Sequence, residues 1–439
     1  MTSPRLSVIG TGYLGATHAA CMAELGYQVV GLDADAEKVK RLSAGELPFF
    51  EPGLEDILRR NLEVGRLTFT TSYDEIAAAD VHFVCVGTPQ RADSYAADLS
   101  YLDAAIDALL PRLTRPCAVV GKSTVPVGTA ERVLERITAS APAGADVELV
   151  WNPEFLREGY AVEDTLRPDR LVFGVRSPAG ERVLREVFAP LIEAGVPVVV
   201  TDLATAQLVK VAANAFLATK ISFINAMAEV CEVVHADVKK LSEALSHDNR
   251  IGGRFLHAGL GFGGGCLPKD IRAFMARADE LGVDQALSFL AEVDAINQRR
   301  RARMVDLALE SVEGSFAGRR VAVFGAAFKP NSDDIRDSPA LDVASRIHAS
   351  GATVTVYDPA AVANARAKYP ALGYAGSAVE AARQADVVLH LTEWQEFRDL
   401  DPADLAGVVR QPRIVDGRNA LDPQRWRDAG WHYRALGRP

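Results

Sequence analysis

Residues 5–33, with the sequence RLSVIGTGYLGATHAACMAELGYQVVGLD, decide the fold of the N-terminal part of the chain. Residues 5–9 (RLSVI) are mainly apolar and predict a buried strand, and a glycine-rich turn follows at residues 10–15. Apolar residues at helical spacing then predict a helix over residues 14–25, and residues 28–33 predict a second strand. A strand, a glycine turn, a helix and a strand in this order form the unit that builds a parallel α/β sheet.

The turn carries the pattern GxGxxG, and an acidic residue follows the second strand. Gly10 is expected to make the tight turn, Gly12 to let a pyrophosphate approach the backbone, and Gly15 to allow close packing of the helix. The phosphates would then meet the positive end of the helix dipole. Asp33 would bind the adenosine ribose hydroxyls and repel a 2′-phosphate, which predicts NAD rather than NADP as cofactor. The alternative is an ordinary tight turn before a helix.

The rest of the chain predicts two further sections. A long helix is expected over residues 204–234, with Thr201 and Asp202 as its cap, and its apolar residues surround too much of the helix for one buried face. This indicates packing on two sides, one of them against a second subunit. Further strands are expected at residues 81–86, 118–122, 147–151, 320–324 and 352–357.

A weak internal repeat supports duplication of the architecture, because residues 79–86 (ADVHFVCV) resemble residues 385–391 (ADVVLHL). We therefore predict an α/β protein with two Rossmann-like domains joined by a central helical domain. The expected limits are residues 1–200 for the NAD-binding domain, 201–300 for the helical dimerisation domain and 315–439 for the second Rossmann-like domain.

Composition limits the class of protein. The chain has 439 residues, 49% hydrophobic and 24% charged, as in a soluble globular protein, and its net charge of -10 argues against nucleic-acid binding. Residues 1–5 show no secretory signal. Polar residues interrupt residues 204–234, so we do not expect this stretch to span a membrane. We expect the protein to be cytosolic. The interrupting residues are Lys210, Asn214, Lys220, Asn225 and Glu229.

The five cysteines form no CxxC pair, which is typical of a reducing compartment and argues against a structural zinc site. His82 and Cys85 lie three residues apart with no second ligand pair near them, so no metal is expected. Cys21, Cys85, Cys117 and Cys231 lie in or beside apolar helices and strands and are expected to be small core residues.

Cys266 differs from the other cysteines, because it lies in the glycine-rich stretch GLGFGGGCLPKD. A helix is expected to begin just after it, with Pro268 in the first turn and Lys269 close by. A helix N-terminus and an ammonium group both favour the thiolate. Cys266 is therefore a candidate nucleophile; the alternative is a loop cysteine without a role.

Two further polar features are candidates for a site. Lys210 and Asn214 are four residues apart on the long helix and share a face, where they could bind a hydroxyl and the negative charge left on its oxygen. The alternative is a solvated lysine beside a paired amide. Glu154 follows a predicted strand, where substrate sites of open sheets lie, and is a candidate general base.

Taken together, these stretches resemble the UDP-glucose/GDP-mannose dehydrogenase family over essentially the whole chain. The motifs that carry the resemblance are GTGYLG from Gly10, CVGTP from Cys85, STVPVGT from Ser123, NPEFLREG from Asn152, GFGGGCLPKD from Gly261 and FKPNSDDIRDSPA from Phe328. Many members have serine where this chain has Gly265.

The resemblance implies oxidation of the C6 hydroxyl of a nucleotide sugar to a carboxylate, with two NAD molecules consumed. Cys266 would capture the aldehyde as a thiohemiacetal, whose oxidation gives a thioester that water hydrolyses. UDP-glucose, giving UDP-glucuronate, is the substrate expected first; dTDP-glucose and GDP-mannose would need almost the same catalytic residues.

The resemblance also implies roles for individual residues. Lys210 would stabilise oxyanions, Asn214 would orient the sugar, and Asp270 would help to accept the first proton. Glu154 would be the base for thioester hydrolysis, with Thr124 positioning water. The residues expected around NAD, besides Gly10, Gly12, Gly15 and Asp33, are Tyr13, Leu14, Lys38, Thr88, Thr124, Glu158 and Arg336. The residues expected around the substrate are Glu154, Phe155, Leu156, Lys210, Asn214, Phe255, Gly263, Cys266, Lys329, Arg418 and Arg250, the last reaching across a dimer interface.

Two other functions remain open from the sequence, and a third lacks the residues that it needs. A two-electron hydroxyacid dehydrogenase also pairs a dinucleotide fold with a lysine and an asparagine on a long helix, but has no need of Cys266 or of a second Rossmann-like domain. A non-catalytic NAD and nucleotide-sugar sensor would show no turnover. A short-chain epimerase would need a Tyr-x-x-x-Lys pair, which this sequence lacks.

Overall fold

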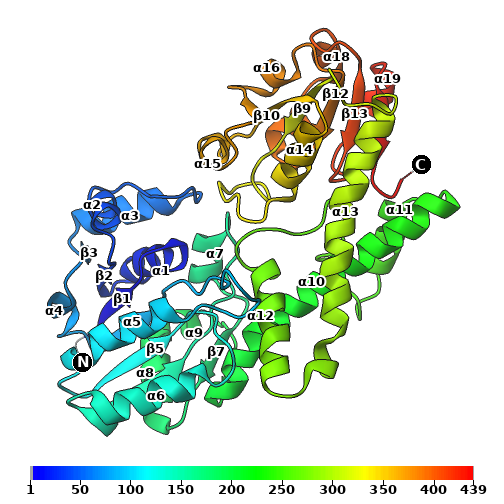
Figure 1. The fold of residues 1–439 in the computed structure, drawn as a ribbon. Helices are drawn as coiled ribbons and strands as arrows, with labels where there is room; N and C mark the ends of the chain where they lie inside the picture. Colours follow the sequence, from blue (N-terminus) through cyan, green and yellow to red (C-terminus); the bar gives the residue numbers. More distant parts are fainter. Residues whose placement is uncertain (1–2, 439) are drawn as a thin grey trace. The chain divides into compact units, whose positions relative to one another are not determined.

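A computed structural model describes residues 3–438, which fall into two compact units that divide between Ala213 and Asn214. The division lies inside one continuous helix, α10 (Leu203–Val234). The expectation for residues 1–5 falls in part on residues 1 and 2, outside the described residues. The limits of the three expected domains stay a prediction, whereas the α/β fold class is confirmed (Figure 1).

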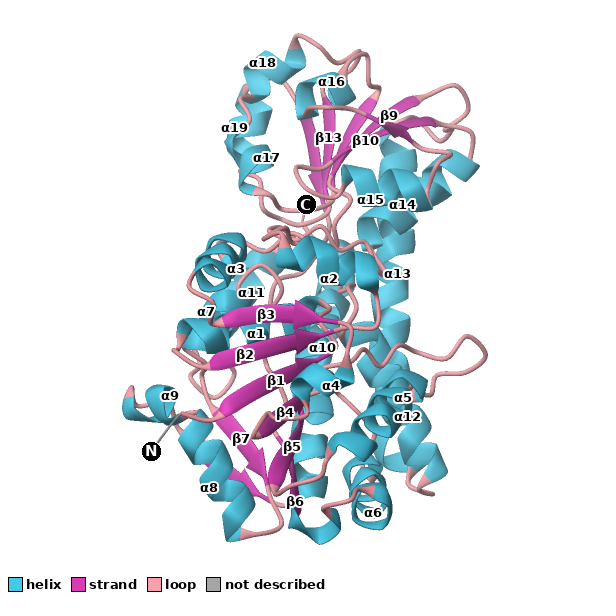
Figure 2. Ribbon diagram, turned by 90° about the vertical axis from the view of Figure 1, so that its left-hand side faces the viewer, coloured by secondary structure: helices cyan, strands magenta, loops and turns pink. Residues whose placement is uncertain are grey.

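The first unit is built on an eight-stranded sheet with the order β3-β2-β1-β4-β5-β6-β7-β8 (Figure 2). Neighbouring strands are parallel except β6 and β7, which pair antiparallel through Trp151 and Gly174. All five strands expected in this part are present to within two residues, and β3, β7 and β8 are additional. The strands are β1 (Arg5–Ile9), β2 (Gln28–Leu32), β3 (Leu67–Thr70), β4 (Val81–Val84), β5 (Cys117–Gly121), β6 (Val147–Trp151), β7 (Leu171–Gly174) and β8 (Val198–Thr201).

Both faces of the central strands are buried, which explains why these strands are mainly apolar. Along β1, Leu6 and Val8 join one hydrophobic cluster with helix α1, whereas Ile9 joins a second cluster on the opposite face. The helices of this unit are α1 (Tyr13–Glu24), α2 (Ala36–Ser43), α3 (Leu54–Glu63), α4 (Tyr73–Ile76), α5 (Ser100–Leu109), α6 (Thr129–Ser140), α7 (Ala161–Leu166), α8 (Pro178–Val187) and α9 (Ala189–Glu193).

The second unit contains a six-stranded parallel sheet with the order β11-β10-β9-β12-β13-β14. Helices α14 and α15 lie on one side of this sheet and α17 to α19 on the other (Figure 2). The strands are β9 (Arg320–Phe324), β10 (Thr353–Tyr357), β11 (Gly373–Tyr374), β12 (Val387–His390), β13 (Arg413–Asp416) and β14 (His432–Ala435). The helices are α14 (Pro339–Ala349), α15 (Val362–Lys368), α16 (Ala378–Ala382), α17 (Gln395–Asp399), α18 (Pro402–Ala406) and α19 (Pro423–Asp428).

Three helices precede that sheet within the second unit: α11 (Val238–Ser246), α12 (Leu267–Glu280) and α13 (Phe289–Ser311). Ala218 of α10, Ile271 of α12 and Leu290 of α13 share one hydrophobic cluster with Phe262. The loop that carries Phe262 is therefore anchored between these helices, and it leads directly into α12.

The internal repeat corresponds to a repeated structural device. Asp80 precedes β4 and accepts a hydrogen bond from the backbone N–H of Arg5, at 2.8 Å, where β1 begins. Asp386 precedes β12 and accepts one from the backbone N–H of Arg320, also at 2.8 Å, where β9 begins. Because β4 lies beside β1 and β12 beside β9, the two sheets use the same polar contact at the same place, and the expected duplication is confirmed.

Helix α10 begins as expected, with the side chain of Asp202 accepting a hydrogen bond from the N–H of Thr205 at 2.7 Å. Its length and apolar composition satisfy the criteria for a membrane-crossing helix, and 44% of its most apolar stretch is buried. The interrupting polar residues do not by themselves exclude such a span, because at most two Asp, Glu, Lys or Arg residues fall in the most apolar 18-residue stretch. A long helix in the core of a water-soluble protein passes the same test.

The repeated aspartates allow a matched test of the fold. We expect Asp386→Ala to destabilise the second unit by about 1.5–3 kcal/mol, the usual value for a hydrogen bond to a charged group. Asp80→Ala should cost less, because the Asp80 side chain is 43% exposed and that of Asp386 is 1% exposed. Differential scanning calorimetry of both variants would measure the two losses, and an equal or larger loss for Asp80→Ala would contradict this assignment.

Candidate active site

The glycine turn after β1 has the geometry that a phosphate-binding turn needs. Gly10 has a φ of +86°, and a Cβ at Gly15 would lie 1.7 Å from the carbonyl oxygen of Gly10, so larger residues are excluded there. A Cβ at Gly12 would meet no atom within 4 Å. Gly12 is also the N-cap of α1 and provides no side-chain hydrogen bond, so the turn is open where a ligand would approach the helix N-terminus.

Asp33 is bound to this turn from the end of β2. Its Oδ2 accepts hydrogen bonds from the backbone N–H of Thr11 at 2.7 Å and from Lys38 Nζ at 2.9 Å. Burial by itself would raise the pKa of Asp33, but these hydrogen bonds outweigh it and the pKa is lowered. The carboxylate is therefore ionised and able to accept hydrogen bonds from a diol.

Tyr13 contacts a buried carboxylate that the sequence did not single out. The Tyr13 hydroxyl donates to Glu51, which is 4% exposed. Glu51 also accepts hydrogen bonds from the backbone N–H groups of Gly159 at 2.6 Å and Ala161 at 2.7 Å. Glu51 thus fixes the end of the NPEFLREG segment against the start of α1.

Two further residues expected around NAD lie together. Thr88 is buried, and its hydroxyl donates to the carbonyl oxygen of Thr124 at 2.7 Å. Glu158 is also buried in the same unit, and Leu14 packs against the cluster on one face of the sheet. The predicted cofactor residues of the first unit therefore gather at the carboxyl ends of the strands, where open sheets bind ligands.

Lys210 and Glu154 form an ion pair. Lys210 Nζ lies 2.9 Å from Glu154 Oε1, and the two side chains are only 6% and 12% exposed. The other oxygen, Oε2, accepts a hydrogen bond from the backbone N–H of Leu156 at 2.7 Å. Lys210 Nζ also lies 5.6 Å from the centre of the Phe155 ring. The structure thus brings four expected substrate residues together: Glu154, Phe155, Leu156 and Lys210.

A second lysine supports the same segment from the end of β5. Lys122 is buried, and its Nζ donates to Asn152 Oδ1 at 2.9 Å. Burial lowers the pKa of Lys122. The Asn152 amide in turn donates to the carbonyl oxygen of Val172 at 3.0 Å, so the residues just before Glu154 are held on both sides.

Asn214 and Asp270 are directly hydrogen-bonded. The Asn214 amide donates to Asp270 Oδ2 at 2.6 Å, and both residues are buried. The other oxygen of Asp270 pairs with Lys269 Nζ at 2.5 Å. Because Lys210 and Asn214 are four residues apart on α10, their side chains leave the same face of that helix one turn apart.

Cys266 is the N-cap residue of α12 and is exposed, as the sequence predicts. Asp270 donates its backbone N–H to the carbonyl oxygen of Cys266 at 3.0 Å, so cysteine and carboxylate belong to one helical turn. The other cysteines are shielded. Burial raises the pKa of Cys21 and Cys85 to about 12 and that of Cys117 to about 11, and it also raises the pKa of Cys231.

Arg418, one of the residues expected to bind the nucleotide, binds the protein backbone. Arg418 is largely buried and donates to the carbonyl oxygens of Leu391 at 2.7 Å, Gly261 at 3.0 Å and Phe328 at 3.1 Å. Burial lowers the pKa of Arg418. Arg418 therefore joins three separate segments through their backbones, and it holds the first residue of the cysteine loop.

Lys329 Nζ lies 5.4 Å from the centre of the Phe328 ring, so it belongs to one of the segments that Arg418 contacts. Phe255 has a φ of +65°, a backbone conformation that is uncommon outside glycine. Arg250 is exposed and pairs with Asp248 at 2.6 Å. Arg250 thus points to solvent from its own chain.

Arg336 and Gly263 both lie against the cysteine loop. The carbonyl oxygen of Arg336 accepts a hydrogen bond from the N–H of Gly264 at 2.8 Å, and the Arg336 guanidinium binds Asp334. A Cβ at Gly263 would lie 2.3 Å from the carbonyl oxygen of Asp337.

Among residues 3–438, no group of three or more His, Cys, Asp or Glu side chains could hold a metal ion.

Comparison with family models matches three successive parts of the chain to the UDP-glucose/GDP-mannose dehydrogenase family. Residues 4–192 match its NAD binding domain, residues 204–299 its central domain and residues 322–423 its UDP binding domain. A UDP-glucose 6-dehydrogenase from Rhizobium meliloti is 42% identical over 99% of this chain and 100% of its own length. One from Pseudomonas aeruginosa is also 42% identical, over 99% of this chain and 98% of its own length.

Solved structures agree over the full length. The UDP-glucose dehydrogenase of Pyrobaculum islandicum has a TM-score of 0.91 and 39% identity, covering 100% of this chain and 98% of its own. A UDP-D-ManNAc dehydrogenase from Pyrococcus horikoshii has a TM-score of 0.86 and 28% identity, covering 99% of both chains. A GDP-mannose dehydrogenase from Pseudomonas aeruginosa has a TM-score of 0.55 and 26% identity, covering 98% of this chain and 99% of its own.

The contrast between the cysteines predicts selective labelling. With iodoacetamide at pH 8, Cys266 should react at least about tenfold faster than any other cysteine of the native protein, because the thiolate is the reactive form. At that pH a thiol with a pKa of about 12 is ionised in only about one molecule in ten thousand. Raising the pH toward 10 should narrow the difference. Peptide mapping by mass spectrometry would measure the rates, and equally fast labelling of Cys117 would contradict the assignment.

Proposed function

Because the chain belongs to the UDP-glucose/GDP-mannose dehydrogenase family, we propose that it oxidises the C6 hydroxyl of UDP-glucose to a carboxylate and so forms UDP-glucuronate. Membership confirms the family, the NAD cofactor and the dehydrogenase class expected from the sequence. The observation that carries the proposal is the position of Cys266, exposed at the N-terminus of α12 in the same turn as Asp270. A two-electron dehydrogenase would have no use for such a thiol.

The residues of the first unit fit NAD. Gly12 leaves the N-terminus of α1 open, and Asp33 supplies an ionised carboxylate for the adenosine ribose. Lys38 is paired with the Oδ2 atom of Asp33 and helps to fix the orientation of this carboxylate. Tyr13, Leu14, Thr88, Thr124, Glu158 and Arg336 complete the proposed set. NAD, when bound, accepts the hydride removed in each of the two oxidations.

Cys266 is proposed to hold the sugar between those oxidations. Its thiolate adds to the aldehyde carbon at C6, and the carbonyl oxygen takes a proton, which gives a thiohemiacetal. This adduct again carries a hydroxyl and a hydrogen on the same carbon, so it can lose a second hydride and a proton and become a thioester. Water then attacks the thioester, releases the carboxylate and returns the thiol.

We propose that three residues bind the C6 group and stabilise the charge that forms there: Lys210, Asn214 and Asp270. The Lys210 ammonium stabilises negative charge on the C6 oxygen. The Asn214 amide orients the sugar, and Asp270, bound to Asn214 at 2.6 Å, helps to take the first proton through water. Glu154 is the proposed base for thioester hydrolysis, with Thr124 placing the water. The ion pair with Lys210 holds the Glu154 carboxylate in a largely buried position.

The match of residues 322–423 to a UDP binding domain supports binding of the nucleotide by the second unit. We propose contacts from Lys329, Arg418, Phe255 and Gly263. The Arg418 guanidinium donates to three carbonyl oxygens, so we expect it to act mainly by holding the segments that form the binding surface. UDP-glucose is favoured over dTDP-glucose and GDP-mannose because the relatives that are 42% identical are named for UDP-glucose. A cytosolic location without nucleic-acid or membrane partners completes the proposal.

The test measures how much NADH and uronate form per UDP-glucose in the native enzyme and in a variant without the Cys266 thiol. The native enzyme should form two NADH and one uronate per UDP-glucose, and should turn over dTDP-glucose and GDP-mannose at least about tenfold more slowly, as ~1.4 kcal/mol of discrimination allows. Cys266→Ala should bind both ligands yet form no uronate. Calorimetric binding, NADH absorbance and chromatography of the product would measure these quantities.

Cys117→Ala is the matched control, because it removes a cysteine remote from the proposed chemistry. Normal uronate formation by Cys266→Ala would refute the covalent route. One NADH per sugar in the native enzyme would favour a two-electron dehydrogenase, and binding without any turnover would favour a sensor.

We also propose that the chain forms a homodimer through α10, as its unusual apolar surface suggests. Phe216, Phe223 and Val230 are spaced by seven residues on this helix and are 65%, 49% and 53% exposed. Residues spaced by seven lie along one face, and a stripe of this kind is typical of a subunit interface. In this proposal Arg250, which points to solvent in its own chain, reaches the substrate of the partner.

Phe223→Glu should convert a dimer into monomers, because it places a charge in the middle of the apolar stripe. Sedimentation velocity would measure the change, with Val379→Glu as the control, since Val379 is similarly exposed at 43% but lies on α16. A native monomer, or an unchanged dimer in Phe223→Glu, would contradict the proposed interface.

A further inference from the structure

The loop before Cys266 is held by two buried side chains of α13. Asn297 is fully buried, and its amide group makes a reciprocal pair with Phe262, accepting from its N–H at 2.8 Å and donating to its carbonyl oxygen at 2.9 Å. Arg301 lies one turn further along α13 and donates to the same carbonyl oxygen at 3.3 Å. Phe262 therefore cannot move without breaking contacts to α13.

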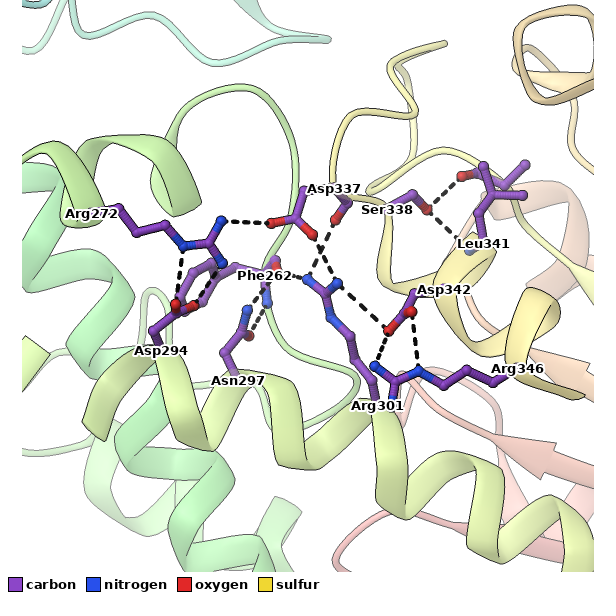
Figure 3. A network of polar contacts seen from close by, with 11 residues as sticks. Phe262, Arg272, Asp294, Asn297, Arg301, Asp337, Ser338, Leu341, Asp342 and Arg346 are labelled. Carbon is purple, nitrogen blue, oxygen red and sulfur yellow. Dashed lines mark hydrogen bonds and ion pairs between the residues drawn. The ribbon is translucent and has the colours of Figure 1, made fainter. Parts of the chain in front are cut away.

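Asp337 lies at the centre of a network of alternating charges that includes this arginine (Figure 3). Arg301 Nη1 lies 2.8 Å from Asp337 Oδ1, and Arg272 Nη1 lies 3.9 Å from Asp337 Oδ2. Arg272 is also paired with Asp294 of α13 at 3.0 Å. At the far edge, Asp342 pairs with Arg346 at 3.0 Å within α14.

The network joins both ends of the segment that carries the cysteine. Arg301 holds Phe262, four residues before Cys266, and Arg272 projects from α12, six residues after it. Both guanidinium groups meet the two oxygens of one carboxylate. The backbone of Asp337 contributes as well, because the Arg301 guanidinium donates to its carbonyl oxygen at 3.4 Å, and that oxygen would lie 2.3 Å from a Cβ at Gly263.

The backbone at Asp337 is strained, with a φ of +44°. Non-glycine residues adopt this left-handed region rarely, and aspartate and asparagine tolerate it better than most. The surrounding contacts therefore hold the residue in an unfavourable conformation, which is the pattern found where a side chain must be placed accurately.

We propose that Asp337 is a positioning residue for Cys266: its carboxylate fixes the loop before the cysteine and the helix after it, and so sets where the thiolate stands. This inference rests on the proposed role of Cys266 as the covalent anchor. Asp337 itself takes no part in bond formation. Its loss should leave ligand binding intact and impair the capture of the aldehyde.

The test compares Asp337→Asn with Arg346→Gln. Asparagine tolerates the left-handed backbone and keeps one acceptor oxygen, but it removes the charge that the two arginines share. Arg346→Gln changes the same network at its exposed edge, away from the cysteine loop. For each variant we would measure kcat, the Kd values of NAD and UDP-glucose, and the amount of C6 aldehyde trapped by hydroxylamine during turnover.

For Asp337→Asn we expect kcat to fall about 10- to 100-fold, the usual cost of displacing a reacting group by about 1 Å. Both Kd values should stay within about twofold of the native values, and hydroxylamine should trap aldehyde that the native enzyme does not release. Arg346→Gln should resemble the native enzyme in all three measurements. A loss of folding alone would not produce released aldehyde together with intact binding.

Unchanged kcat without trapped aldehyde in Asp337→Asn would overturn the inference, and so would equal losses in Arg346→Gln. If Asp337→Asn does not fold, Arg272→Gln breaks the α12 side of the same contact and should give the same three results; native behaviour there would also overturn it. Failure of the proposed function would be recognised separately, because Cys266→Ala would then still form uronate.

Discussion

Close packing around residues 261–265 is the constraint on which the rest of the second unit depends. A Cβ at Gly261 would lie 2.0 Å from Asn297 Oδ1, and one at Gly264 would lie 2.8 Å from the Phe328 ring. Only glycine therefore fits at positions 261 and 264, where the chain passes between α13 and the segment before α14. Gly265 is the exception, because its neighbour is the end of the flexible Arg336 side chain, 2.3 Å away, which can move aside. This explains how serine can stand at that position in many family members. The outcome of the packing is a cysteine at a helix N-terminus, exposed to solvent while the backbone behind it is fixed.

The two sheets are stabilised by buried carboxylates at equivalent places. Asp33 binds the turn after β1, and Asp358 binds the turn after β9 by accepting hydrogen bonds from the N–H groups of Ala326 and Ala327 at 2.8 and 3.0 Å. Asp33 is the carboxylate that we propose for the ribose of NAD, whereas Asp358 also accepts a hydrogen bond from the indole N–H of Trp394 at 3.1 Å. The two units thus share one arrangement of strand, turn and carboxylate. The first unit matches an NAD binding domain, whereas in the second unit a tryptophan side chain already binds the equivalent carboxylate.

Local patterns in the sequence predicted much of this structure. The strands of residues 5–9, 147–151 and 320–324 and the helix predicted over residues 204–234 follow from apolar runs and periodicity, and Cys266 stood out because glycine surrounds it. Short edge strands such as β3, β11 and β14 were not predicted, since few of their residues are apolar and their stability comes from pairing with a neighbour. The supporting polar residues were missed for a similar reason. Glu51 meets Gly159 across 108 positions and Asn297 meets Phe262 across 35, so no local spacing reveals either contact.

A covalent bond between Cys266 and the sugar is the central step of the proposed reaction. Glu154→Gln should slow hydrolysis of the thioester while leaving the two oxidations in place, since the proposed base is lost and the thiol is kept. Rapid acid quenching after mixing this variant with UDP-glucose and NAD, followed by peptide mass spectrometry, would then detect the uronyl adduct. We predict that the adduct lies on the peptide that carries Cys266. Turnover with no adduct on any peptide, or with an adduct on a different residue, would contradict the central claim.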